Sequence, residues 1–147
     1  MAYQGIFKPK NTDKYLGDPT NIVYRSRWEL KFMMYLDSHS NVVKWASEEF
    51  CIPYRSPIDN KIHRYFPDFL VKKKTPDGKI ETIVVEIKPE SQSKPPKPMD
   101  GKPTKSYLRE VYNWGTNSAK WKAANKYCMD RGWQFAVLGE TALGIKF

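Results

Sequence analysis

The clearest alternation of hydrophobic and polar residues lies near the middle of the chain, in the run from 83 to 88. Side chains in a strand have a period of two, so the apolar odd-numbered positions of this run form one face. Glu86 and Lys88 share the opposite face with Val84. The pattern therefore predicts a strand that presents a carboxylate and an ammonium group in the same direction.

A second apolar run precedes this strand. Residues 62–73 predict a long strand that is bent or bulged at Pro67, and residues 75–78 have the Thr-Pro-Asp-Gly composition of a tight turn. A hairpin would place the two strands side by side, and the bend would turn the Asp68 side chain away from the face that simple alternation assigns to it. We therefore expect Asp68 to lie close to Glu86.

A helical period appears first near the N-terminus. Ser26 and Glu29 fit a capping box, and the helix is expected to end near Ser38. The apolar positions of this segment fall at helical spacing: Trp28, Phe32, Tyr35 and Leu36. Glu29 therefore has a structural role open to it, as the acceptor for the backbone N–H of Ser26 at the positive end of the helix.

The other patterned segments complete a mixed α/β order. Gly115 is expected to separate two helices, and Gly132 to end the second of them. The predicted elements are strands at 42–45 and 50–54, helices at 106–114 and from 116 or 117 to 131, and a last strand at 133–138. The resulting order is α-β-β-β-α-β, a mixed sheet flanked by helices.

Two segments lack such periodicity. Residues 1–20 combine glycine and proline with scattered apolar residues, and we interpret them as an N-terminal arm. Residues 90–105 are expected to form a basic, proline-rich loop, because the stretch from 91 to 103 holds four prolines and three lysines. Two roles are open for this stiff loop, a clamp on DNA or a surface loop without function.

Length and composition indicate one folded domain spanning residues 1–147. The hydrophobic content of 40% and the aromatic content of 14% favour a packed globule over a disordered chain. Lys and Arg outnumber Asp and Glu by 25 to 16, which gives a net charge of +9. This charge is typical of a polyphosphate partner such as DNA, although ribosomal and membrane-surface proteins share it. It predicts a DNA affinity that falls steeply as the salt concentration rises.

Other classes of site and location have little support in the sequence. No apolar run approaches the ~18–20 residues of a membrane span, and the N-terminus lacks the apolar core of a secretory signal. Cys51 and Cys128 have no C-x-x-C spacing that would indicate a zinc site. We expect a soluble, intracellular protein that has no membrane association and no small-molecule cofactor.

The candidate chemistry lies where the two predicted strands meet. Asp68 and Glu86 would converge at one end of the sheet, with Lys88 one pleat away, and such a pair can hold a hard divalent cation and an activated water. The alternative is that Glu86 and Lys88 form an ordinary surface ion pair worth ~0–1 kcal/mol. The Pro67-Asp68 doublet and the intervening hairpin turn favour the catalytic interpretation.

These residues also carry a family resemblance. Pro67-Asp68 followed by Glu86-Ile87-Lys88 resembles the PD-(D/E)XK nuclease superfamily, whose restriction-endonuclease-like core is a mixed sheet flanked by helices. Segments between residues 21 and 90 look more narrowly like the TnsA-type endonuclease domain: Tyr24–Glu29, Val43–Trp45, Ile52–Tyr54, Arg64–Phe69 and Val85–Pro89. The length, the charge and the order of segments are also similar to the head-completion nucleases of large contractile-tailed phages.

The resemblance implies a metal-dependent DNA endonuclease that acts on packaged phage DNA during head completion and head-tail joining. It implies Mg²⁺, or Mn²⁺ as a substitute, held by Asp68, Glu86 and the backbone carbonyl of Ile87. Glu29 would be a catalytic acid on the first helix that completes this metal shell or holds a second ion. Lys88 would orient the attacking water and neutralise developing charge.

The candidates for contact with DNA phosphates are basic residues of the helices and the proline-rich loop: Arg25, Arg27, Lys31, Lys94, Lys97 and Lys120. Lys120 is interpreted as lying on a solvated side of its helix, with a position facing the metal site as the alternative. The implied partners are DNA and phage head or neck proteins, in the host cytoplasm or on the virion. Two alternatives remain open: a catalytically inactive DNA-binding module of the phage head, and a TnsA-like transposase subunit that needs a second protein.

Overall fold

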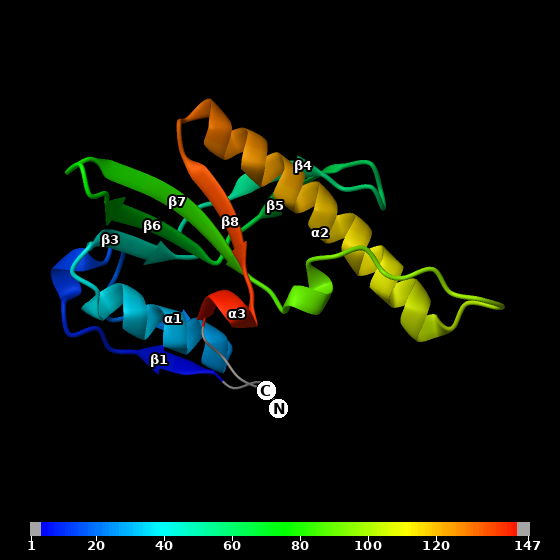
Figure 1. The fold of residues 1–147 in the computed structure, drawn as a ribbon, viewed down its shortest axis with the longest axis horizontal. Helices are drawn as coiled ribbons and strands as arrows, with labels where there is room; N and C mark the ends of the chain where they lie inside the picture. The colour runs from blue at the N-terminus through cyan, green and yellow to red at the C-terminus, as the bar shows by residue number, and fades with distance from the viewer. Residues whose placement is uncertain (1–3, 144–147) are drawn as a thin grey trace.

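Four strands form a mixed sheet that carries helices on both faces (Figure 1). The computed structural model describes residues 4–143. The strand order is β3-β6-β7-β8, in which β8 runs parallel to β7 and the other neighbours are antiparallel. The strands span Val42–Ser47 (β3), Phe69–Lys74 (β6), Ile80–Ile87 (β7) and Gln134–Leu138 (β8). This arrangement confirms the predicted fold class, a restriction-endonuclease-like α/β core.

Helix α1 (Arg27–Ser38) covers one face of the sheet, and its bounds agree with the prediction. The Ser26 hydroxyl accepts a hydrogen bond from the backbone N–H of Glu29 at 3.1 Å, which begins the helix. The helix buries an apolar stripe against the sheet, formed by Phe32, Met33 and Leu36. In β7 the alternating residues Ile83, Val85 and Ile87 pack into this same core. Glu86 must therefore point to the other face of the sheet.

Helix α2 (Lys105–Asp130) covers that other face, together with a two-stranded ribbon of β4 (Ile52–Arg55) and β5 (Ile62–Tyr65). The prediction of two helices separated by Gly115 is wrong, because α2 is continuous through this position. A glycine inside a helix costs only ~0.5–1 kcal/mol, and no proline lies nearby to break the hydrogen-bond ladder. Gly132 follows the helix with a φ of +71°, as predicted for its end.

The predicted long strand over residues 62–73 is also wrong, because the chain changes sheets within it. β5 pairs with β4 in the ribbon, whereas β6 belongs to the main sheet. Pro67 is buried between them and has no N–H to donate to a strand ladder. Asp68 therefore lies at the junction of the ribbon and the sheet. The predicted hairpin between β6 and β7 is present, and its Gly78 has a φ of +83°.

The N-terminal segment is packed onto the body of the protein rather than extended as an arm. β1 (Gly5–Phe7) pairs with β2 (Ile22–Tyr24), a 3₁₀ turn follows at Thr12–Lys14, and Tyr15 is buried against Trp45. The buried carboxylate of Asp37 accepts backbone N–H groups from Lys10 at 2.9 Å and Asn11 at 3.0 Å. The scattered apolar residues of this segment are therefore core contacts, which a short non-periodic pattern does not reveal.

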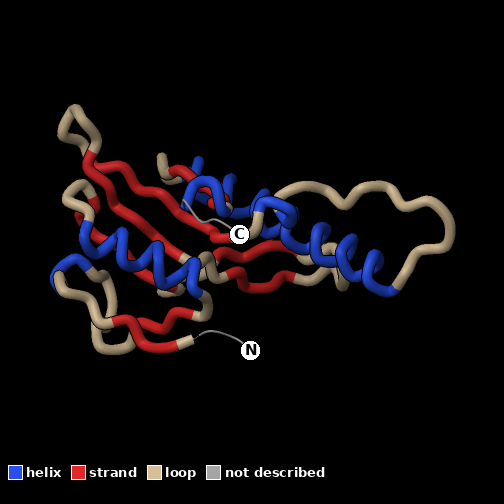
Figure 2. The backbone as a smooth tube through the Cα atoms, turned by 60° about the horizontal axis from the view of Figure 1, so that its bottom comes forward, coloured by secondary structure: helices blue, strands red, loops and turns tan. Residues whose placement is uncertain are grey.

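The proline-rich loop leaves the sheet after a 3₁₀ turn at Glu90–Gln92 and runs beside the N-terminal half of α2 (Figure 2). In both views this loop and this half of the helix extend well beyond the sheet. A short helix, α3 (Glu140–Leu143), ends the described part of the chain. Among residues 4–143, no helix combines the length and the apolar character needed to cross a bilayer.

Candidate active site

Asp68 and Glu86 lie side by side, as the hairpin prediction requires. Phe69, the first residue of β6, pairs with Val85 of β7, so the preceding Asp68 falls beside the end of β7. One carboxylate oxygen of Asp68, Oδ2, accepts the backbone N–H of Ile87 at 2.8 Å. The register of the β6–β7 hairpin therefore brings together two carboxylates that are eighteen positions apart in the sequence.

Glu86 is buried on the α2 side of the sheet, where the ribbon contributes a polar partner. The hydroxyl of Tyr65, the last residue of β5, donates to Glu86 Oε2 at 2.5 Å. Tyr65 itself is buried in a second apolar cluster with Ile52, Tyr54 and Ala124. No sequence pattern indicated this role, because residues 62–73 predict one strand, bent or bulged at Pro67, that carries both Tyr65 and Asp68.

Burial and mutual repulsion make the two carboxylates costly to ionise together. Burial, followed by the charge of Glu86, raises the pKa of Asp68 to about 8, and the N–H of Ile87 opposes the rise. Burial also raises the pKa of Glu86, while Tyr65, Lys88 and Lys120 lower it. An acidic pair with little exposure to solvent is stabilised by any cation that binds between its members.

Two lysines lie on the Glu86 side of the pair. Lys88 follows β7 on the same face as Glu86, and its charge lowers the pKa of that carboxyl. Lys120 of α2 is half-buried, with Nζ 5.7 Å from the ring centre of Tyr65 and 5.9 Å from that of Tyr54. It also acts on Glu86 electrostatically. The interpretation of Lys120 as a solvated helix residue is therefore wrong, and its side chain faces the site.

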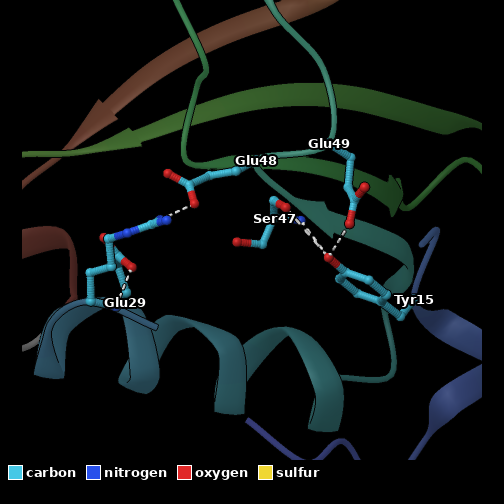
Figure 3. Close-up of polar contacts among 6 residues, drawn as sticks. Tyr15, Glu29, Ser47, Glu48 and Glu49 are labelled. Atoms are coloured by element: carbon cyan, nitrogen blue, oxygen red, sulfur yellow. Dashed lines mark hydrogen bonds and ion pairs between the residues drawn. The ribbon is translucent and has the colours of Figure 1, made fainter. Parts of the chain in front are cut away.

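Glu29, Glu48 and Arg25 lie on the opposite side, near Asp68. The charges of both glutamates raise the pKa of Asp68, after the larger effects of burial and Glu86. Glu29 Oε2 accepts the backbone N–H of Arg25 at 2.8 Å, so it caps the helix one residue earlier than the predicted bond to Ser26. The Arg25 guanidinium pairs with Glu48, whose backbone N–H donates to the carbonyl of Asp68 at 3.1 Å. Figure 3 shows Glu48 above the first turn of α1, which carries Glu29.

Glu48 is a site neighbour that no sequence pattern indicated. It follows β3 with a φ of +53°, a left-handed conformation that is uncommon for a residue other than glycine. The next residue, Glu49, points away from Glu48 and accepts the Tyr15 hydroxyl at 2.8 Å (Figure 3). The turn after β3 therefore directs one acid toward the site and the other toward the N-terminal segment.

The remaining basic candidates are spread over the surface. Arg27 and Lys31 are exposed on α1, and Lys94 and Lys97 are exposed in the proline-rich loop. Lys94 lines a crevice of about 340 Å³ between this loop and α2. Of the six predicted DNA contacts, Arg25 and Lys120 lie next to the acidic pair.

The donor set of the site fits a small, hard cation. Mg²⁺ is usually held in proteins by one or two carboxylates, and it completes its coordination with waters and substrate phosphates. Asp68 and Glu86 supply two carboxylates whose charges are incompletely balanced by the surrounding residues. Within residues 4–143, no group of three or more His, Cys, Asp and Glu side chains is disposed to hold a metal together. Glu29 thus neighbours the acidic pair without forming a three-residue cluster with it.

Comparison with known proteins places this geometry in a family. Residues 39–140 match the model of the TnsA-like endonuclease N-terminal domain. The chain belongs to this family. It is also 40% identical, over 99% of both chains, to the head completion nuclease of Enterobacteria phage T4. The matched region contains Asp68, Glu86 and Lys88, whereas Glu29 precedes it. The family and the relative are both described as nucleases, so the comparisons support nuclease activity for this chain.

Proposed function

We propose that the protein is a Mg²⁺-dependent endonuclease that hydrolyses phosphodiester bonds of DNA. The observation that carries the proposal is the pairing of two carboxylates, half-buried Asp68 and buried Glu86, with Lys88 on the same face as Glu86. The net charge of +9 supports a polyanionic substrate. Hydrolysis needs no covalent intermediate, and the acidic pair itself offers no strong nucleophile.

Asp68, Glu86 and the carbonyl of Ile87 would hold Mg²⁺, with Mn²⁺ as a substitute. The ion, when bound, supplies Lewis-acid stabilisation of charge on the phosphate and lowers the pKa of the attacking water. The N–H of Ile87 holds Asp68 Oδ2, and the Tyr65 hydroxyl holds Glu86 Oε2, so the backbone and the ribbon orient both carboxylates. The two carboxylates would therefore hold the ion in orientations that the fold has already set.

Charged residues are distributed unevenly around the pair of carboxylates. Glu29 and Glu48 lie on the Asp68 side together with Arg25, which pairs with Glu48, whereas Lys88 and Lys120 lie on the Glu86 side. Lys88 would orient the attacking water and neutralise charge that develops on the phosphate. Arg25, Arg27, Lys31, Lys94 and Lys97 would contact the DNA backbone outside the reacting group. Glu29 would act from the edge of the site, through its charge on Asp68 or as a ligand added when metal binds.

The relative suggests where this activity is used. That protein is named a head completion nuclease, and it matches the present chain over its whole length. We infer that this chain acts on packaged phage DNA when the head is completed and joined to the tail. Its partners would then include head or neck proteins, in the host cytoplasm or on the virion.

Plasmid nicking tests the proposal directly. Purified protein should nick supercoiled plasmid with Mg²⁺ and not with excess chelator. Asp68→Asn and Glu86→Gln should each lower the rate by at least about 100-fold, because losing a metal ligand costs no less than losing its supporting partner. Asp77→Asn is the matched control, since this acid lies in the exposed turn of the same hairpin. Unchanged nicking by both site variants would refute the proposal.

The same assay separates two other functions. An inactive DNA-binding module would bind plasmid without nicking it at any metal concentration. A TnsA-like transposase subunit would nick only after a second protein is added. The full-length match to a nuclease of similar size favours activity of the isolated chain over both.

A further inference from the structure

We propose that Tyr65 is a positioning residue that determines which oxygen of Glu86 is presented to the divalent cation. Tyr65 donates its only hydroxyl proton to Glu86 Oε2 at 2.5 Å. The hydroxyl thereby fixes the direction of this oxygen, and with it the orientation of the carboxylate that an ion would meet. The inference rests on the proposed metal-binding role of Glu86 and adds a residue from a separate part of the fold.

The contact joins two elements that belong to different sheets. Tyr65 lies at the end of β5 in the ribbon, and Glu86 lies in β7 of the main sheet. Both residues are buried, with exposed fractions of 4% for Tyr65 and 8% for Glu86. Water therefore has little access to replace the hydroxyl as a donor. A hydrogen bond from a neutral hydroxyl to a carboxylate is also one of the stronger kinds in proteins.

Packing holds the tyrosine ring independently of this hydrogen bond. The ring lies in a cluster with Ile52, Tyr54 and Ala124, and the Lys120 ammonium is 5.7 Å from its centre. The donor is thus fixed before any ion arrives, which spares the site the cost of ordering Glu86 on binding. The ribbon and α2 thus hold Tyr65 in place, and Tyr65 in turn orients Glu86.

Without the hydroxyl, Glu86 would be free to turn toward the positive charges beside it. Lys88 and Lys120 act on this carboxylate, as does the backbone N–H of Asp68. The two ammonium groups lack the fixed direction of a buried O–H donor. Such a rotation would change the orientation of the carboxylate that an ion meets. Loss of an outer partner of a metal ligand typically weakens metal affinity or activity by about 10–100-fold.

The test compares Tyr65→Phe with Tyr54→Phe, which removes a hydroxyl from the neighbouring ring of the same cluster. Calorimetric titration of Mn²⁺ into each protein without DNA measures metal affinity, and nicking rates over a range of Mg²⁺ concentrations measure activation. Tyr65→Phe should bind Mn²⁺ about 10–100-fold more weakly and need correspondingly more Mg²⁺ for half-maximal rate. Tyr54→Phe should behave as the wild type in both measurements.

Wild-type Mn²⁺ affinity in Tyr65→Phe would overturn the inference. A general folding defect would lower the rate equally at all Mg²⁺ concentrations and leave the half-saturating concentration unchanged, and that result would overturn it as well. The same titration of Asp68→Asn and Glu86→Gln separates a failure of the proposed metal site from a failure of the positioning role. If Asp68→Asn and Glu86→Gln also bind Mn²⁺ with wild-type affinity, the proposed function fails. If Tyr65→Phe alone keeps wild-type affinity, only the positioning role fails.

Discussion

The carboxyl group of Asp68 has a strongly raised pKa. Burial and the charge of Glu86 raise that pKa from 3.8 to about 8. An acid whose pKa is raised by folding binds a proton more tightly in the folded state than in the unfolded state. Its contribution to stability is therefore complete below the unfolded pKa and is lost as the pH rises through the folded pKa.

We predict that the free energy of unfolding of the metal-free protein decreases as the pH rises from about 4 to about 8. Asp68→Asn should largely remove this decrease, because the amide does not ionise and no longer repels Glu86. Urea denaturation in the presence of chelator, at several pH values in this window, measures the effect. Asp77→Asn is the control, since the pKa of Asp77 is lowered by its bond to Thr75 and its loss should leave the decrease in place. A wild-type pH profile in Asp68→Asn would contradict the assignment.

Sequence reasoning predicted the residues of the site that lie on the β6–β7 hairpin. Asp68 and Glu86 follow from strand periodicity and a turn signal, which are local and therefore visible in the sequence. Tyr65, Glu48 and Lys120 come from other segments, and only the packing of the ribbon and α2 on the sheet brings them to the same place. No spacing rule connects these segments.

The helices and strands show the same difference between features set by local sequence and features set by long-range packing. The capping box of α1 predicts the observed bounds of that helix, whereas the alternation at 83–88 indicates β7 but not its start at Ile80. The sequence predicts a bend at Pro67, where the structure shows a change from one sheet to another. A proline indicates that the hydrogen-bond ladder is interrupted, but it does not indicate which sheet the following residues join. Gly115 was read as a break because helix propensity disfavours glycine, yet contacts of α2 with β4 and β8 override that preference.

The continuity of α2 gives a prediction about stability. A Cβ atom added at Gly115 would meet no other atom within 4 Å, apart from the helix's own backbone and the adjacent residues. Gly115→Ala should therefore raise the free energy of unfolding by ~0.5–1 kcal/mol. Thermal unfolding followed by circular dichroism measures this gain. Gly132→Ala provides the contrast and should be destabilising, because its φ of +71° disfavours a side chain. Destabilisation by Gly115→Ala would indicate a helix break at this position.

The whole molecule is organised around the boundary between its two apolar cores. One core joins α1 to the sheet, and the other joins α2 to the ribbon. Asp68 lies where the chain passes from the ribbon into the sheet, and Glu86 lies on the sheet face that looks toward the ribbon. The two carboxylates thus meet where these layers meet, and the structure around them fixes their separation.

Diffraction from crystals grown with Mn²⁺ is the most direct test of the central claim, that Asp68 and Glu86 together bind a catalytic cation. Anomalous scattering would locate the ion without assumptions about activity. We predict one peak between the two carboxylates, in contact with an oxygen from each and with the carbonyl of Ile87, and no such peak in Glu86→Gln. An ion bound elsewhere, with the carboxylates of Asp68 and Glu86 left uncoordinated at saturating Mn²⁺, would contradict the account.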